Sequence, residues 1–244
     1  GATNNIRAGC STKDKMALMI GTPGAMRVAC EGESPDELPP SLWSYRASRS
    51  RVVVGGALSD GGGLFRWLRE SLQLETTDLE SQLTALEPDA HGLTVMPFWS
   101  GERSTGWSPD ARGAIFGLKQ ETQPIEIVRA TLEAIAYRFA LIARALESIA
   151  PGANIVASGN ALRFSPVWIQ ILADVLGRQI APGTAPEASI RGVALLALEA
   201  VGKIASIEEV AVSSAEVFEP DVMRHARYRE GLARQEEFYE RLFS

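Results

Sequence analysis

The stretch KMALMIGTPGAMRVAC, residues 15–30, decides the fold class of this chain. Two short apolar runs, rich in Met, Val and Ile, flank a glycine turn, and this pattern predicts two neighbouring strands. In such a turn the glycines let backbone N–H groups approach an anion, and Thr22 adds a hydroxyl donor. The segment Gly21-Thr22-Pro23-Gly24 is therefore either a phosphate-binding turn or a plain hairpin.

Beyond this stretch, short strand patterns alternate with helical ones and predict one α/β layered domain. The clearest helix covers residues 125–149, where apolar residues recur every three or four positions; Pro124 suits its first turn and Thr122 its cap. Asp60 is the expected cap of a helix over 62–74. The remaining strands are predicted at 51–54, 93–98 and 154–157, the remaining helices at 165–176, 189–201 and 222–243, and a surface excursion at 31–50.

The bulk composition excludes several classes of protein. Apolar residues make up 45% of the 244 residues, which is ordinary for a globular domain, and a net charge of −6 argues against a nucleic-acid partner. No apolar run approaches the roughly 20 residues of a membrane helix. Cys10 and Cys30 are expected to be buried, reduced thiols. With only His91 and His225 present, a histidine-based metal site or a Ser-His triad has little support.

Two further glycine turns are candidates for ligand binding. The triplet Gly61-Gly62-Gly63 opens a predicted helix, so it either forms an anion site at the helix N-terminus or allows close packing. Ser158-Gly159-Asn160-Ala161 lies between a predicted strand and a predicted helix, which is where α/β folds place nucleotides. Its spacing is not that of the GxGxxG fingerprint, so an NAD site is not expected.

Charged residues gather in one loop after the strand at 93–98. Glu102 and Arg103 stand among glycines and aromatic residues there. Two readings stay open: an ion-pair network that fixes the loop, or direct contact with a substrate.

Four segments in order carry a resemblance to a known family. They are MPFWSGERSTGWSPDARGAIFGL at 96–118, IVRATLEAIAYRF at 127–139, SGNALRFSPVWIQILADVLG at 158–177 and EASIRGVALLALEAVG at 187–202. Together they resemble the C-terminal half of the FGGY family of carbohydrate kinases, in its gluconokinase- and xylulokinase-like branch. The resemblance implies an α/β, actin-like (ribonuclease H-like) ATPase domain with a mixed β-sheet flanked by α-helices. Residues 1–244 would be the nucleotide-binding domain of a two-domain kinase, without the N-terminal sugar-binding domain.

The resemblance also implies where the nucleotide binds. Gly21, Thr22 and Gly24 match the phosphate-binding turn, although Pro23 replaces the usual Ser and removes one N–H donor. Gly61 and Gly62 match a segment bordering the nucleotide. Gly159, Asn160 and Ala161 match the adenosine turn, where Asn160 replaces a glycine.

The expected catalytic base lies outside these residues. The family places an aspartate immediately before the residue that aligns with Gly1, so no catalytic residue is expected in this chain; a second reading is that Ala2 replaces the aspartate. No metal ligand is expected either, because Mg²⁺ would bind through the phosphates.

The implied function is ATP-dependent phosphorylation of a sugar or sugar acid, of gluconate or xylulose type, in the cytoplasm. ATP and Mg²⁺ are the expected cofactors. This chain alone is expected to be inactive, and the surface that normally faces the other domain could drive homodimer formation. The alternative is a non-catalytic, actin-like, nucleotide-dependent sensor, which the substitutions at Pro23 and Asn160 favour.

Overall fold

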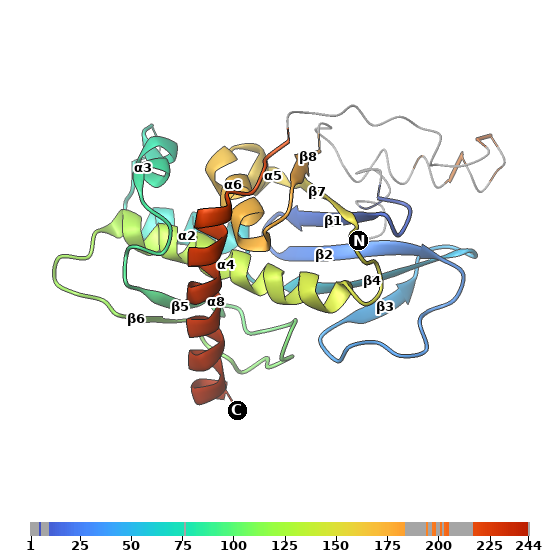
Figure 1. Cartoon of the computed structure of the whole chain (residues 1–244), viewed down its shortest axis with the longest axis horizontal. Coiled ribbons are helices and arrows are strands. Elements are labelled where there is room, and N and C mark those ends of the chain that lie inside the picture. The colour runs from blue at the N-terminus through green and yellow to red at the C-terminus, as the bar shows by residue number, and fades with distance from the viewer. Residues whose placement is uncertain are drawn as a thin grey trace.

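The computed structural model describes residues 5, 10–75, 77–183, 194, 197–198, 201, 203–204 and 217–243. Its centre is a six-stranded sheet in the order β3-β4-β2-β1-β7-β8, and two further strands, β5 and β6, form a small antiparallel pair (Figure 1). The strands are β1 (Lys15–Ile20), β2 (Gly24–Glu31), β3 (Trp43–Arg46), β4 (Arg51–Leu58), β5 (Thr94–Met96), β6 (Ala114–Phe116), β7 (Asn154–Ser158) and β8 (Ile180–Pro182).

The sheet is mixed, and its register brings several turns to one edge. β1 runs antiparallel to β2 and parallel to β7, while β2 runs antiparallel to β4. Ile20 pairs with Gly24, Gly24 pairs with Leu58, and Met19 pairs with Ser158. The carboxyl ends of β1, β4 and β7 therefore lie together with the start of β2.

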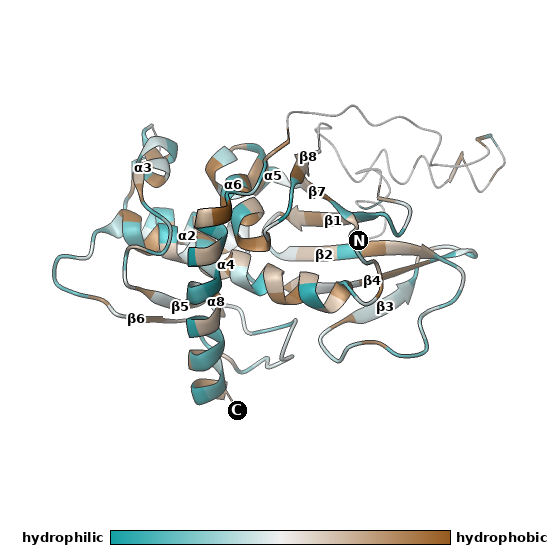
Figure 2. Cartoon of the chain, in the orientation of Figure 1, coloured by the Kyte–Doolittle hydropathy of each residue, from teal (hydrophilic) through white to brown (hydrophobic). Residues whose placement is uncertain are grey.

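Helices pack on one face of the sheet. α4 (Pro124–Leu146) lies along it, and α6 (Pro166–Leu176) and α8 (Val222–Phe243) lie beside α4 (Figure 1). Every second side chain of β1 and β2 joins Leu132 and Phe139 of α4 in the main core, because strand side chains alternate between faces. In Figure 2 the arrow of β1 is brown, whereas β3 is pale and much of α8 is teal. The other helices are α2 (Gly62–Ser71), α3 (Leu79–Ala85) and α5 (Asn160–Arg163).

The predicted elements are largely confirmed, with differences at their ends. The strand expected at 51–54 continues to Leu58, so the glycines at 55 and 56 lie inside β4 and not in a turn. A Cβ on Gly56 would lie 2.8 Å from Ile142 of α4, which explains a glycine in mid-strand. The expected excursion at 31–50 contains β3, and α3, α5, β6 and β8 were not predicted. Most of the helix expected at 189–201 lies outside the described residues.

Two predicted helix caps were wrong. Gln123, not Thr122, caps α4: its side chain and that of Glu126 form a reciprocal capping box, and Pro124 occupies the first turn as expected. Gly61 precedes α2 without a side-chain cap, because the Asp60 carboxylate bonds to Ser100 instead. Within the described ranges, no helix is both long and apolar enough to cross a membrane.

Candidate functional site

Three glycine-bearing segments meet at the edge where β1, β4 and β7 end. The N–H of Gly62 donates to the carbonyl oxygen of Gly21 at 2.8 Å, and the N–H of Gly63 donates to that of Thr22 at 3.0 Å. A Cβ on Gly62 would lie 2.6 Å from the Cβ of Ala161. The turn after β1, the start of α2 and the start of α5 are therefore in direct contact, as a shared ligand site requires.

Gly159 holds a conformation that only glycine tolerates. Its φ is +108°, and a Cβ there would lie 2.2 Å from the carbonyl oxygen of Ile20. Asn160, by contrast, is the first residue of α5. The left-handed conformation thus falls on Gly159, and Asn160 needs no positive φ.

The N–H groups at the N-terminus of α2 are already engaged, which favours close packing over the expected anion site. The N–H groups of Gly62 and Gly63 already donate to the turn after β1, and that of Leu64 donates to Gly61. These donors cannot also bind a phosphate. The three glycines serve close packing, which was the other reading of this segment.

The exposed donors lie on the turn itself. Thr22 is exposed, and its hydroxyl has no hydrogen-bond partner among the residues that the structure describes. Near Gly21 a Cβ would meet only Met19 Sδ at 3.6 Å and the Pro23 carbonyl oxygen at 4.0 Å, so a ligand has room there, although the Gly21 N–H itself donates to the Pro23 carbonyl oxygen at 3.0 Å. Gly24 is buried, since a Cβ on it would lie 2.7 Å from Phe139 Cζ. Gly24 thus shapes the turn, while Gly21 and Thr22 face outward.

Asp60, between β4 and α2, ties this edge to the loop after β5. Its carboxylate accepts hydrogen bonds from the Ser100 N–H at 2.8 Å and the Ser100 hydroxyl at 2.9 Å. Burial raises the pKa of Asp60, although these hydrogen bonds oppose the shift. A cavity of about 10 Å³ beside Asp60, Glu102 and Arg138 has room for roughly one water molecule.

Glu102 belongs to a buried ion pair, as one of its two readings predicted, but its partner is Arg138 of α4. Both side chains are buried and in contact. Tyr239 of α8 donates to the second carboxylate oxygen of Glu102 at 2.6 Å, and its ring lies 4.9 Å from the Arg138 guanidinium carbon. Arg103 is exposed, and no described carboxylate lies within ion-pair distance of it. Of the two charged residues, Glu102 and not Arg103 therefore helps to fix the loop.

A second buried cluster has the residue types of a metal site but not the free ligand atoms. Ligand atoms of Asp89, His91 and Glu133 lie within 4.8 Å of one another. His91 Nδ1 accepts the Leu93 N–H at 3.0 Å, so its Nε2 carries the proton that faces Glu133 at 3.0 Å. Glu133 also accepts from Arg129 at 2.6 Å. With its lone pairs engaged, this cluster does not fit a cation and joins α4 to its neighbours instead.

Comparison with known proteins settles the family. Residues 16–201 match the C-terminal domain of the FGGY family of carbohydrate kinases. This chain belongs to that family. It is 32% identical to a gluconokinase of Bacillus licheniformis over 224 residues, covering 86% of this chain and 43% of that protein. It is 31% identical to a glycerol kinase of Trichormus variabilis over 206 residues, covering 80% and 41%.

Solved structures support the FGGY assignment. A ligand-bound xylulose kinase from Lactobacillus acidophilus superposes with a TM-score of 0.88 at 25% identity, covering 99% of this chain and 50% of that one. A gluconate kinase from the same organism gives 0.87 at 25% identity and the same coverage. The expected actin-like fold, a mixed sheet flanked by helices, is confirmed. The chain spans about half the length of the relatives it matches.

Several buried residues of this FGGY domain were missed by sequence reasoning. Glu133 and Arg138 lie inside the apolar repeat of α4, and Tyr239 lies on a highly charged helix. The available signal was the presence of charged residues at core-facing positions of α4, where an unpaired charge is costly and a partner is therefore required.

Proposed function

We propose that this chain is the nucleotide-binding domain of a carbohydrate kinase, which transfers the γ-phosphoryl group of ATP to a hydroxyl of a sugar or sugar acid. The observation that carries the proposal is the meeting of three turns at one sheet edge, in a chain that matches the C-terminal FGGY domain over residues 16–201. The gluconokinase and xylulose kinase relatives indicate the type of substrate.

The turn after β1 would receive the phosphates. Gly21 leaves room for a ligand and Thr22 offers an exposed hydroxyl, while Gly24 holds the turn against α4. Gly61 and Gly62 keep α2 in contact with this turn. The adenosine would lie along Gly159, Asn160 and Ala161, at the carboxyl end of β7 as in other α/β nucleotide sites.

Mg²⁺ bound with ATP would neutralise charge on the transferred phosphoryl group. Within the three turns the nearby carboxylate is that of Asp60, which is buried and bonded to Ser100. The protein would therefore hold the ion through the phosphates and its water molecules, because Mg²⁺ keeps several waters in such sites.

The remaining machinery belongs to other parts of the polypeptide. The base that accepts the proton of the sugar hydroxyl is proposed to be an aspartate immediately before Gly1, and the sugar would be bound mainly by a second domain. The second domain is supported by the coverage, since the chain matches 43% of the length of the gluconokinase relative, and the aspartate rests on the family resemblance alone. We place the reaction in the cytoplasm, and we expect the 244-residue chain alone to be inactive, because half of the cleft is missing.

The test is ATP-dependent phosphorylation by the complete gene product, with this chain assayed alongside against a panel of sugars, polyols and sugar acids. We expect turnover by the complete protein and none by the chain. Thr22→Val, which removes the exposed hydroxyl and keeps the shape, should weaken ATP binding about 3- to 10-fold without changing stability. If the complete protein binds ATP and phosphorylates nothing on the panel, the kinase proposal fails and the nucleotide-dependent sensor replaces it.

A further inference from the structure

Arg27 is an arginine in the middle of the sheet. It lies on β2 between Ala17 of β1 and Gly55 of β4, and it is only 9% exposed. Its side chain points away from the core face, which receives the alternate residues Met26 and Val28. A Cβ on Gly55 would lie 2.8 Å from Arg27 Cγ, so the glycine of β4 makes room for the arginine stem.

Two buried donors of Arg27 have no acceptor among the residues that the structure describes. Its Nε and Nη1 are both buried and unpaired, and so is the indole Nε1 of Trp43, whose ring lies 5.8 Å from the Arg27 guanidinium carbon. Burial lowers the pKa of Arg27, and nearby Arg103 lowers it further, but an arginine keeps its charge at neutral pH. The site therefore holds a cation and a neutral N–H donor, and no carboxylate of the described part of the chain pairs with them.

Other buried arginines of this domain are paired. Arg138 contacts Glu102, and Arg129 contacts Glu133, both through buried carboxylates. A buried, unpaired charge is costly, so proteins supply a partner or use the charge for a ligand. The missing partner of Arg27 is consequently an anion.

The position of Arg27 fits one end of the substrate. It follows Gly24, the last residue of the proposed phosphate turn, by three strand residues, which is about 10 Å along β2. Ala25, next to the turn, shares the face of Arg27. A sugar acid whose terminal hydroxyl reacts beside the turn would extend its opposite end, the carboxylate, along this face.

Building on the proposed kinase function, we infer that Arg27, assisted by the Trp43 indole N–H, binds the carboxylate of a sugar-acid substrate. The substrate class is then a sugar acid of gluconate type, and neutral ketoses and polyols are poorer substrates. A desolvated guanidinium binds a carboxylate through charge-assisted hydrogen bonds, which a neutral hydroxyl does not match. Arg27 is thus a specificity residue, with no role at the reacting atoms.

The experiment compares Arg27→Met, Arg27→Lys and the control Arg51→Met in the complete gene product. Arg51 is an equally buried arginine of the same sheet, 3.8 Å from Glu31 and remote from the turn. Gluconate and its neutral counterpart glucitol are titrated by calorimetry, and both are assayed for phosphorylation. We expect Arg27→Met to weaken gluconate binding about 10- to 100-fold and to raise its KM similarly. Glucitol binding, kcat and the KM for ATP should not change, Arg27→Lys should recover part of the loss, and Arg51→Met should match the parent protein.

Four other results would overturn the inference. One is an equal loss for gluconate and glucitol, and another is a parent protein that prefers the neutral compound. A third is binding of inorganic phosphate at Arg27 without binding of gluconate. The fourth is a marked fall in the melting temperature of ligand-free Arg27→Met, since that would place a carboxylate of the polypeptide against Arg27. If the parent binds gluconate through Arg27 yet phosphorylates nothing, the sugar-acid site stands and the kinase function fails.

Discussion

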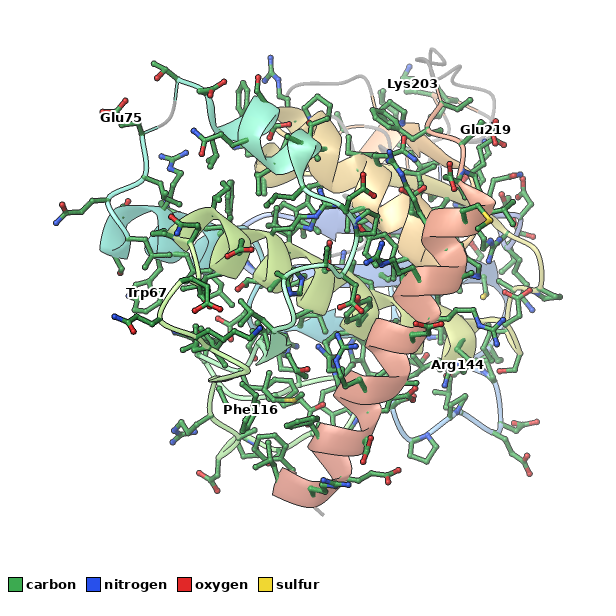
Figure 3. The ribbon with its side chains drawn as sticks, turned by 60° about the vertical axis from the view of Figure 1, so that its left-hand side comes forward. Trp67, Glu75, Phe116, Arg144, Lys203 and Glu219 are labelled. Carbon is green, nitrogen blue, oxygen red and sulfur yellow. The ribbon has the colours of Figure 1, made fainter. Side chains whose placement is uncertain are left out.

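The hydroxyl of Tyr239, on the last helix, donates a 2.6 Å hydrogen bond to Glu102, which lies 137 residues earlier in the chain. The same carboxylate contacts Arg138 of α4 and accepts the N–H groups of Thr105 and Gly106 at 3.2 and 3.1 Å. One buried carboxylate thus joins α8, α4 and the loop after β5. Phe116 lies beside the lower part of α8 in Figure 3 and packs on Phe238 with ring centroids 4.8 Å apart, which reinforces this junction.

Tyr239→Phe should destabilise the domain by about 1–3 kcal/mol, because a buried carboxylate loses a donor. The effect should depend on pH. Burial and Glu102 raise the pKa of Tyr239 from 10 to about 12. The stabilising contribution is therefore complete below pH 10 and is lost as the pH rises through about 12. Urea unfolding of parent and variant at pH 8, 10 and 11 measures the difference; a gap that stays constant to pH 11 and beyond would contradict the assignment.

Removing one member of the Glu102–Arg138 pair should cost about 3–5 kcal/mol, because the other charge stays buried without a partner. Arg138→Met and Glu102→Gln, combined in a double variant, should cost clearly less than the sum of the single changes. Chemical denaturation of all four proteins gives the coupling energy. Arg144→Met, at the exposed end of α4, is the control and should stay within about 0.5 kcal/mol of the parent. Additive effects at Glu102 and Arg138 would show that the two residues do not act as a pair.

Gly159→Ala should destabilise by at least about 3 kcal/mol and abolish ATP binding, because the new Cβ would meet the Ile20 carbonyl oxygen in a left-handed conformation. Gly152→Ala is a matched control. Gly152 also has a positive φ, +66°, but nothing lies within 4 Å of its would-be Cβ. It should cost only about 1–2 kcal/mol and leave ATP affinity unchanged. Thermal unfolding measures the effect on stability, and nucleotide titration measures the effect on ATP affinity. Equal losses at both glycines would rule out the close contact with β1.

The two cysteines should resist thiol reagents until the domain unfolds. Cys10 and Cys30 are buried thiols outside any disulfide, as predicted, and burial raises the pKa of Cys10 to about 12. The reactive thiolate is therefore scarce at neutral pH. Reaction with a chromogenic disulfide should be slow in buffer and should rise with the unfolding transition in urea. Rapid labelling of one thiol in native buffer would contradict the burial.

Local sequence signals predicted the strands and helices whose formation depends mainly on residues close together in the chain. The strands beside Gly21 and the helix from Pro124 follow from side-chain periodicity and from the conformations that Gly and Pro allow. The partner of Glu102 could not be predicted, because Arg103 is its neighbour in sequence while Arg138 meets it only after α4 packs on the sheet. For the same reason, nothing in the sequence signalled that two buried donors of Arg27 lack an acceptor among the described residues.

The glycines of the sequence predicted the position of the candidate site. They did not predict which backbone groups are free to bind a ligand. The three glycine turns meet as expected, because each follows a strand that ends at the same edge of the sheet. Whether a backbone N–H is free depends on tertiary contacts, and those of Gly62 and Gly63 are taken by carbonyl groups of another segment. Sequence alone shows that donors exist, and it does not show which of them are already used.

The hydrogen bonds donated by Gly62 and Gly63 join α2 to the turn after β1, so the two segments should move together. A displacement of the turn on arrival of a ligand must be carried into the helix, since the helix begins on the carbonyl groups of Gly21 and Thr22. Trp67 lies on this helix, 48% exposed at its outer side, with its ring 5.8 Å from that of Trp99 (Figure 3). The fluorescence of these two tryptophans is therefore expected to change when the turn after β1 moves, without any attached label.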